Sequence, residues 1–214
     1  MRKFEQELEQ LKRRVMEMGA MAEEMVRSST AAFVDHDAAA LERVLADEPK
    51  LDQFQIEIDG EAVRLITIYA PIARDLRFLL MVTRINIDLE RIGDQAVNNC
   101  EYVQSMSASP PGPLSDLSQM SENTRRMVHD ALQAFDEEDA AKAEAVLKCD
   151  DEVDRLYNQT FRDLVEDVSE DADRLGRSMN LILVARSLER IADHATNICE
   201  EVIYMVRSED IRHR

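Results

Sequence analysis

Pairs of carboxylates four residues apart are the feature of this sequence with the clearest chemical potential. The chain contains four such pairs: Glu48 with Asp52, Glu90 with Asp94, Asp150 with Asp154, and Glu189 with Asp193. Residues four apart lie about 5 to 6 Å from each other on one face of a helix, where two like charges cost a few tenths of a kcal/mol. Carboxylate oxygens are the ligands that Mg, Mn, Fe or Ca accept. If helices that carry two pairs lie side by side, four carboxylates converge on one cation site.

Amide side chains extend the same helix faces. Asn98 and Asn197 lie one turn beyond Asp94 and Asp193. A rotation of about 100° per residue places these faces away from the apolar stripe of each helix, so an ion would bind on the surface of the protein. A single acidic pair is commonly a solvated face, on which Arg91 pairs with Asp94. Four repeated pairs leave a cation site and an inherited acidic surface as comparably good interpretations.

The acidic pairs belong to an internal repeat. A shift of 102 residues aligns residues 37–39 with 139–141, and Asp52 with Asp154. Further along, the shift falls to 99, and LERIGDQAVNNCEYV (residues 89–103) aligns with LERIADHATNICEEV (residues 188–202). A shorter connection in the second copy accounts for the three lost residues.

The repeat predicts two homologous halves, residues 1–108 and 114–214, joined by the proline-rich segment 109–113. Each half is expected to contain three helices, so the fold class is all-α. The third helix of the first half shows apolar residues at steps of three and four: Phe78, Val82, Ile85, Leu89, Ile92, Ala96, Cys100 and Val103. Breaks are predicted near residues 35–37, 69–71, 137–139 and 169–171. Short connections predict an antiparallel three-helix bundle in each half, and Pro49 is expected to kink the second helix.

Composition excludes several classes of protein. The 26 basic and 44 acidic residues give a formal charge of −18, which disfavours nucleic acid and anionic membranes as partners. No apolar run is long enough to cross a membrane or to form a signal peptide, so we expect a cytoplasmic protein without direct membrane insertion. Cys100 and Cys199 fall on the apolar stripes and are interpreted as core residues.

The sequence lacks the motifs of several enzyme classes. No phosphate-binding P-loop and no Glu-x-x-His pair of a ferritin-like di-metal centre is present. His194 follows Asp193 and is interpreted as a surface histidine rather than a ligand. A surface di-metal phosphohydrolase stays open as an alternative, because clustered carboxylates can hold two ions and activate water.

The segments 73–103 and 181–206 closely resemble the motifs of the PhoU family, accessory regulators of the high-affinity phosphate transporter. The resemblance covers nearly the whole chain, including the tandem halves and the Asp75-Leu76-Arg77 element. It implies two three-helix bundles related by a pseudo-twofold axis, with metal ions bound on their surfaces by the four acidic pairs. It further implies a cytoplasmic, non-enzymatic negative regulator of phosphate uptake and of the phosphate regulon, which contacts the transporter's ATPase subunit and a sensor histidine kinase.

Three questions stay open at this level. The resemblance is compatible with service to a different phosphate transporter, and oxygen-rich sites distinguish Mg, Mn, Fe and Zn only through geometry and supply. The third helix of the first half is apolar nearly all round, with Leu80 and Ile87 opposite the main stripe. This pattern predicts that the two halves, or the two subunits of a homodimer, pack there.

Overall fold

The computed structural model describes residues 2–35, 37–105, 115–170 and 175–211, and all regular structure within these ranges is helical. This confirms the predicted all-α class. The elements are α1 (Arg2–Val34), α2 (Ala38–Tyr69), α3 (Ala73–Ser105), α4 (Ser115–Glu137), α5 (Ala140–Leu147), α6 (Asp150–Glu170) and α7 (Leu175–Arg207). Within this part of the chain, no helix is both long and apolar enough to span a membrane.

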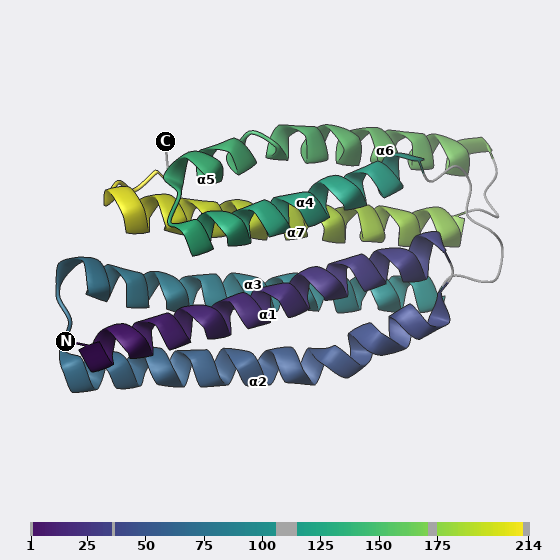
Figure 1. Cartoon of the computed structure of the whole chain (residues 1–214). Coiled ribbons are helices and arrows are strands. Elements are labelled where there is room, and N and C mark those ends of the chain that lie inside the picture. Colours follow the sequence, from purple (N-terminus) through teal and green to yellow (C-terminus); the bar gives the residue numbers. More distant parts are fainter. Residues whose placement is uncertain (1, 36, 106–114, 171–174, 212–214) are drawn as a thin grey trace.

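The helices form two bundles, α1 to α3 and α4 to α7, as the sequence repeat predicts (Figure 1). The predicted breaks near residues 35–37, 69–71 and 137–139 coincide with the ends of α1, α2 and α4. The segment 109–113 lies outside the described residues, and the break near 169–171 does so in part. Asp37 and Asp139, which the repeat aligns, both cap the following helix by accepting two backbone N–H groups.

The second helix of the second half differs from its counterpart, because it is divided into α5 and α6 at Lys148 and Cys149. In the first half, α2 is continuous through Pro49 and is bent in its N-terminal part (Figure 1). Neither proline nor glycine marks the break after α5, so the sequence did not predict it. Three acidic residues open α6, and carboxylates are favourable at the N-terminus of a helix. Acidic residues thus open α6 in the second half, whereas Pro49 lies within a continuous, bent α2 in the first half.

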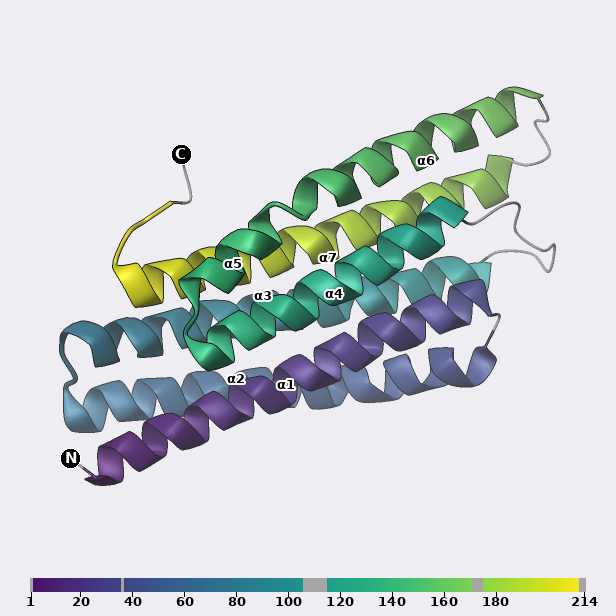
Figure 2. The same cartoon turned by 45° about the horizontal axis from the view of Figure 1, so that its top comes forward.

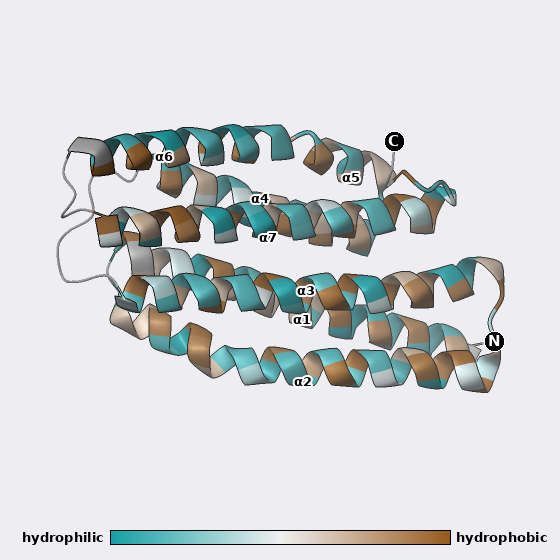
Figure 3. Cartoon of the chain, turned by 180° about the vertical axis from the view of Figure 1, so that it is seen from behind, coloured by the Kyte–Doolittle hydropathy of each residue, from teal (hydrophilic) through white to brown (hydrophobic). Residues whose placement is uncertain are grey.

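The helices are arranged in two layers. Viewed from behind, α2, α3, α7 and the α5/α6 pair lie side by side in one layer (Figure 3), while α1 and α4 cover its other side (Figures 1 and 2). Buried apolar side chains from both bundles form one continuous core between the layers. Cys100 and Cys199 belong to this core, as predicted, and burial raises the pKa of the Cys100 thiol to about 12.

The two halves meet chiefly through α3 and α7, which pack along their length. Arg84 Nη1 donates to both carboxylate oxygens of Glu201, at 3.1 and 3.2 Å. One turn away, Asp88 Oδ1 lies 2.9 Å from His194 Nδ1 and accepts a hydrogen bond from Asn197 Nδ2 at 3.1 Å. The interpretation of His194 as a surface histidine is therefore wrong, because its side chain is only 18% exposed and is held between the halves.

Candidate cation site at two acidic clusters

Close contact between α2 and α3 positions the acidic residues of the first half. Gly93 of α3 lacks a side chain, and a Cβ atom there would lie only 2.1 Å from Leu51 Cδ2 of α2. Asn86 Nδ2 donates to the Gln55 carbonyl oxygen and to Asp59 Oδ1, both at 2.9 Å, and so fixes how far the two antiparallel helices are shifted. This register places Asp52, which follows Leu51, beside the neighbours of Gly93, which include Asp94.

Asp52, Glu90 and Asp94 form the first acidic cluster. Burial raises the pKa of Glu90, and the negative charges of Asp94 and Asp52 raise it further. Burial also raises the pKa of Asp94; the Arg91 guanidinium opposes this effect and Asp52 reinforces it. The carboxylates of two helices therefore repel one another across the α2–α3 contact, and a bound cation would relieve that repulsion.

Asp150, Asp154, Glu189 and Asp193 form the second acidic cluster, on α6 and α7. Burial raises the pKa of Asp150 to about 6, with further contributions from Asp154, Asp193 and Asp151. Burial and the neighbouring carboxylates likewise raise the pKa of Glu189 and of Asp193. The second half thus reproduces the electrostatics of the first with one more carboxylate.

Three further predicted ligands, Glu48, Asn98 and Asn197, have other surroundings or partners. The charges that act on Glu90 and Asp94 include Asp52 but not Glu48, which precedes Pro49 in the bent part of α2. Asn98 Nδ2 points to Gln95 Oε1 at 3.4 Å, and Asn197 Nδ2 donates to Asp88. The Nδ2 groups of these amides therefore donate along α3 and across the α3–α7 contact.

His194 connects the two clusters, which the sequence did not suggest. In its protonated form it lowers the pKa of Glu90 and Asp94 from α7 and also that of its neighbour Asp193. The clusters therefore lie on either side of one inter-helix contact. Only the packing of α3 on α7, which brings together residues about 100 positions apart, reveals this arrangement.

The donor groups fit a hard cation, although they do not yet enclose one. Glu90 Oε2 and Asp150 Oδ1 are buried without a hydrogen-bond partner, although Arg91 Nε lies 3.5 Å from Glu90 Oε2. Such atoms are costly unless a cation or a proton satisfies them. Arg91 approaches the first cluster, with its Nη1 3.3 Å from Asp94 Oδ2. Within the described ranges, no three His, Cys, Asp or Glu side chains are grouped closely enough to hold a metal ion. Binding would thus need these side chains to move closer together.

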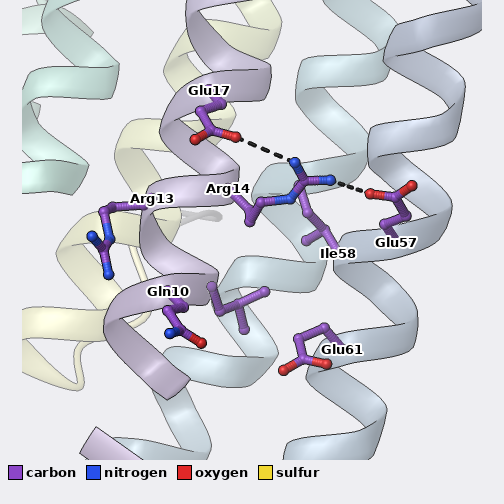
Figure 4. A pocket seen from close by; sticks show the side chains of 8 residues that line it. Gln10, Arg13, Arg14, Glu17, Glu57, Ile58 and Glu61 are labelled. Carbon is purple, nitrogen blue, oxygen red and sulfur yellow. Dashed lines mark hydrogen bonds and ion pairs between the residues drawn. The ribbon is translucent and has the colours of Figure 1, made fainter. Parts of the chain in front are cut away.

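A separate pocket of about 680 Å³ lies between α1 and α2 and contains none of the cluster residues. Figure 4 shows Arg14 at its wall between Glu17, 3.3 Å away, and Glu57. The guanidinium also lies 4.4 Å from the centre of the Phe54 ring. Two carboxylates of this pocket already pair with Arg14, so the acidic clusters are the better candidate for a site.

Removing the Asp150 charge is expected to stabilise the metal-free protein at neutral pH. A pKa of about 6 in the folded chain, against an ordinary 3.8, means that the folded state binds the proton more tightly than the unfolded state. This contribution to stability is fully present below the unfolded pKa and is lost as the pH rises through the folded pKa. Asp150→Asn should raise the free energy of unfolding by about 1 to 2 kcal/mol at pH 7, after allowance for solvent and for the helix dipole at the start of α6.

Urea unfolding in the presence of a chelator, at about pH 3 and at pH 7, measures this difference. The gain should disappear at the lower pH, where the wild-type carboxyl is already protonated. An equal gain at both pH values would contradict the electrostatic origin.

Known proteins resemble this chain over nearly its whole length. A family model described as PhoU domain matches residues 15–103 and 117–202, one copy in each half. The phosphate-specific transport system accessory protein PhoU homolog of Pseudomonas aeruginosa is 36% identical over 217 residues, which cover 98% of this chain and 88% of that protein. The homolog of the same name from Aquifex aeolicus is also 36% identical, and the alignment covers 99% of this chain and 96% of that protein.

The crystal structure of PhoU from Pseudomonas aeruginosa superimposes with a TM-score of 0.93 at 35% identity, covering 96% of this chain and 100% of that one. The agreement includes both bundles and their packing against each other. Because the family model matches both halves and the relatives align over nearly their full length, the chain belongs to the PhoU family.

Proposed function

We propose that the chain is a cytoplasmic, non-enzymatic accessory regulator of a phosphate-specific transport system, and that it restrains phosphate uptake and the phosphate regulon when phosphate is plentiful. The observation that carries this proposal is the alignment of nearly the whole chain with proteins named as accessory to that transport system. The proposed partners are the transporter's ATPase subunit and the sensor histidine kinase. An acidic helical body suits such an adaptor, because charge complementarity steers and selects protein partners.

The acidic clusters supply a physical basis for regulation by a cation. Asp52, Glu90 and Asp94 would hold an ion on the first bundle, and the second acidic cluster would do so on the second. A divalent or trivalent ion such as Mg, Mn, Fe or Zn supplies the positive charge that these carboxylates lack. The carboxylates of α2 and α3 are then both attracted to the ion, which offsets their mutual repulsion and holds the two helices in one arrangement. The outer face of the four-helix layer would thereby keep the shape that the partners recognise.

Deletion of the gene tests the regulatory role. We expect a strain without the chain to express a phosphate-starvation reporter in phosphate-rich medium and to take up phosphate without restraint. A plasmid copy of the wild-type gene should restore repression. Normal repression in the deleted strain would contradict the proposed function, as would a response confined to a different phosphate transporter.

A further inference from the structure

An exposed apolar patch adjoins the first acidic cluster on the outer face of the four-helix layer. The first apolar patch consists of Ile56 and Val63 on α2 and Leu80 and Ile87 on α3, each at least 45% exposed. The bonds from Asn86 to Gln55 and Asp59 set Ile56 and Ile87 at the same level along the two helices. Val63 and Leu80 lie seven residues, or about two turns, further toward the connection between α2 and α3. The other half of the protein therefore does not cover Leu80 and Ile87, contrary to one of the two expectations.

A second apolar patch occupies the corresponding place on the second bundle. It consists of Phe161 and Val165 on α6 and Leu175 and Met179 on α7, each at least 44% exposed. Asp167 Oδ2 accepts hydrogen bonds from Arg177 Nη2 and Ser178 Oγ, both at 3.2 Å, and this sets the register of α6 on α7. Val165 and Met179 consequently lie beside each other. Figure 3 shows apolar colouring on the outer ribbons of α2 and α3 toward one side and of α6 and α7 toward the other.

The two patches are related by the sequence repeat. The shift of 102 residues aligns Val63 with Val165, and the shift of 99 aligns Leu80 with Met179. A soluble surface gains nothing from exposed large apolar side chains, and contiguous patches mark sites of interaction. The repeat covers these two pairs only, because Ile56 aligns with Asn158 and Ile87 with Arg186. The shared pairs indicate a related site on each bundle, in corresponding places of the fold.

Charge distinguishes among the possible occupants. Ile56 follows Asp52 by one turn and Ile87 precedes Glu90 by three residues, so the apolar surface passes directly into the acidic cluster. A second copy of this face would oppose carboxylates to carboxylates, in a chain of net charge −18. An anionic bilayer would meet the same repulsion. A segment that is apolar along one side and basic at one end complements the face in both respects.

We propose that the two apolar patches dock two copies of one amphipathic helix, apolar along one side and basic at one end, presented by a twofold-symmetric protein partner. Side chains seven residues apart on both α2 and α3 match the repeat of an apolar helix face, as in other complexes of a helix in a groove. Two patches related by a twofold predict one chain of this protein for two copies of the partner segment. The proposal rests on the proposed function in taking the transporter and the kinase as the partners.

The test measures binding of the full chain to the phosphate transporter and to the sensor kinase, each held in nanodiscs. The first-patch variant carries Val63→Gln and Leu80→Gln, and the second-patch variant carries Val165→Gln and Met179→Gln. The control is Ile68→Gln, an exposed apolar residue that lies about 140° around α2 from Val63. These changes add no charge and suit a helix. Empty nanodiscs report any binding to the lipid, and the mass of the free chain by light scattering reports self-association.

For at least one of the two partners, each patch variant should bind at least ten-fold more weakly than the wild type, and the control should bind as the wild type does. That binding should weaken with added salt and saturate at one chain per partner dimer. Wild-type affinity in both patch variants for both partners would overturn the docking proposal alone. Equal binding of the wild type to empty nanodiscs would also overturn the docking proposal alone. So would a wild-type dimer that is lost only in the patch variants. If the wild type binds neither partner, the proposed function itself is wrong, and the docking proposal fails with it.

Discussion

A variant that keeps the shape of the α3 and α7 carboxylates but removes their charge is expected to bind no stoichiometric metal, whereas the wild type binds it at both clusters. This amide variant carries Glu90→Gln, Asp94→Asn, Glu189→Gln and Asp193→Asn. Each cluster then loses the two carboxylates that its third helix supplies, and hard cations bind neutral amides weakly. We expect affinity to fall by more than about 100-fold, because the loss of supporting groups alone costs 10- to 100-fold.

The amide variant should remain folded, because it removes groups that repel one another. Burial and neighbouring charges raise the pKa of all four of these carboxyl groups, so their ionised forms cost stability in the metal-free chain. Elemental analysis after purification without chelator measures the metal, and circular dichroism measures the fold. A matched control removes four exposed carboxylates outside the clusters: Glu9→Gln, Glu42→Gln, Asp163→Asn and Glu166→Gln. Equal metal in both variants would show that the clusters are not the binding site.

Filling the space at Gly93 is expected to have the largest effect on stability. A Cβ at this position would already lie 2.1 Å from Leu51 Cδ2 and 3.5 Å from Met25 Cε, so the larger side chain of Gly93→Leu cannot be placed without moving α2 from α3. Overpacking of a core costs about 1 to 3 kcal/mol or more, and we expect a loss of about 3 kcal/mol in the free energy of unfolding. The separation of the helices should also weaken metal binding at the first acidic cluster.

The second half supplies a control for this prediction. The repeat aligns Gly93 with Ala192 and Leu51 with Val153, and both of these residues are buried. Val153 on α6 is smaller than Leu51, and this leaves room for the methyl group of Ala192 on α7. The double variant Gly93→Ala with Leu51→Val should therefore keep a stability close to that of the wild type. Urea unfolding compares the variants, and an undisturbed Gly93→Leu would contradict the close helix approach.

The sequence predicted those parts of the fold that depend on local pattern. Apolar residues at steps of three and four marked the long helices, and the repeat of Asp52 with Asp154 and of residues 89–103 with 188–202 marked the two bundles. The acidic pairs at helical spacing pointed to the clusters because α2 and α3 are neighbours in any three-helix bundle. The charges of Asp52 and Asp94 both act on Glu90, so the three carboxylates are electrostatic neighbours across α2 and α3. Their role as metal ligands stays a prediction.

The parts that it missed depend on contacts between the halves. His194 pairs with Asp88 only because α3 packs antiparallel on α7, and no local pattern specifies that register. The break after α5 precedes a run of acidic residues at the start of α6, and neither glycine nor proline marks it. Glu48 lies in the bent part of α2. Although it is four residues from Asp52, only Asp52 is among the charges that raise the pKa of Glu90 on α3.

We propose that the acidic clusters couple a bound cation to the control of phosphate uptake. The most direct test compares the wild type, the amide variant and its charge-matched control in the deleted strain, by reporter expression in phosphate-rich medium. We expect repression by the wild type and by the control, and none by an amide variant that accumulates to the same level. Full repression by the metal-free amide variant would contradict the coupling and leave an adaptor that works through its shape and surface charge.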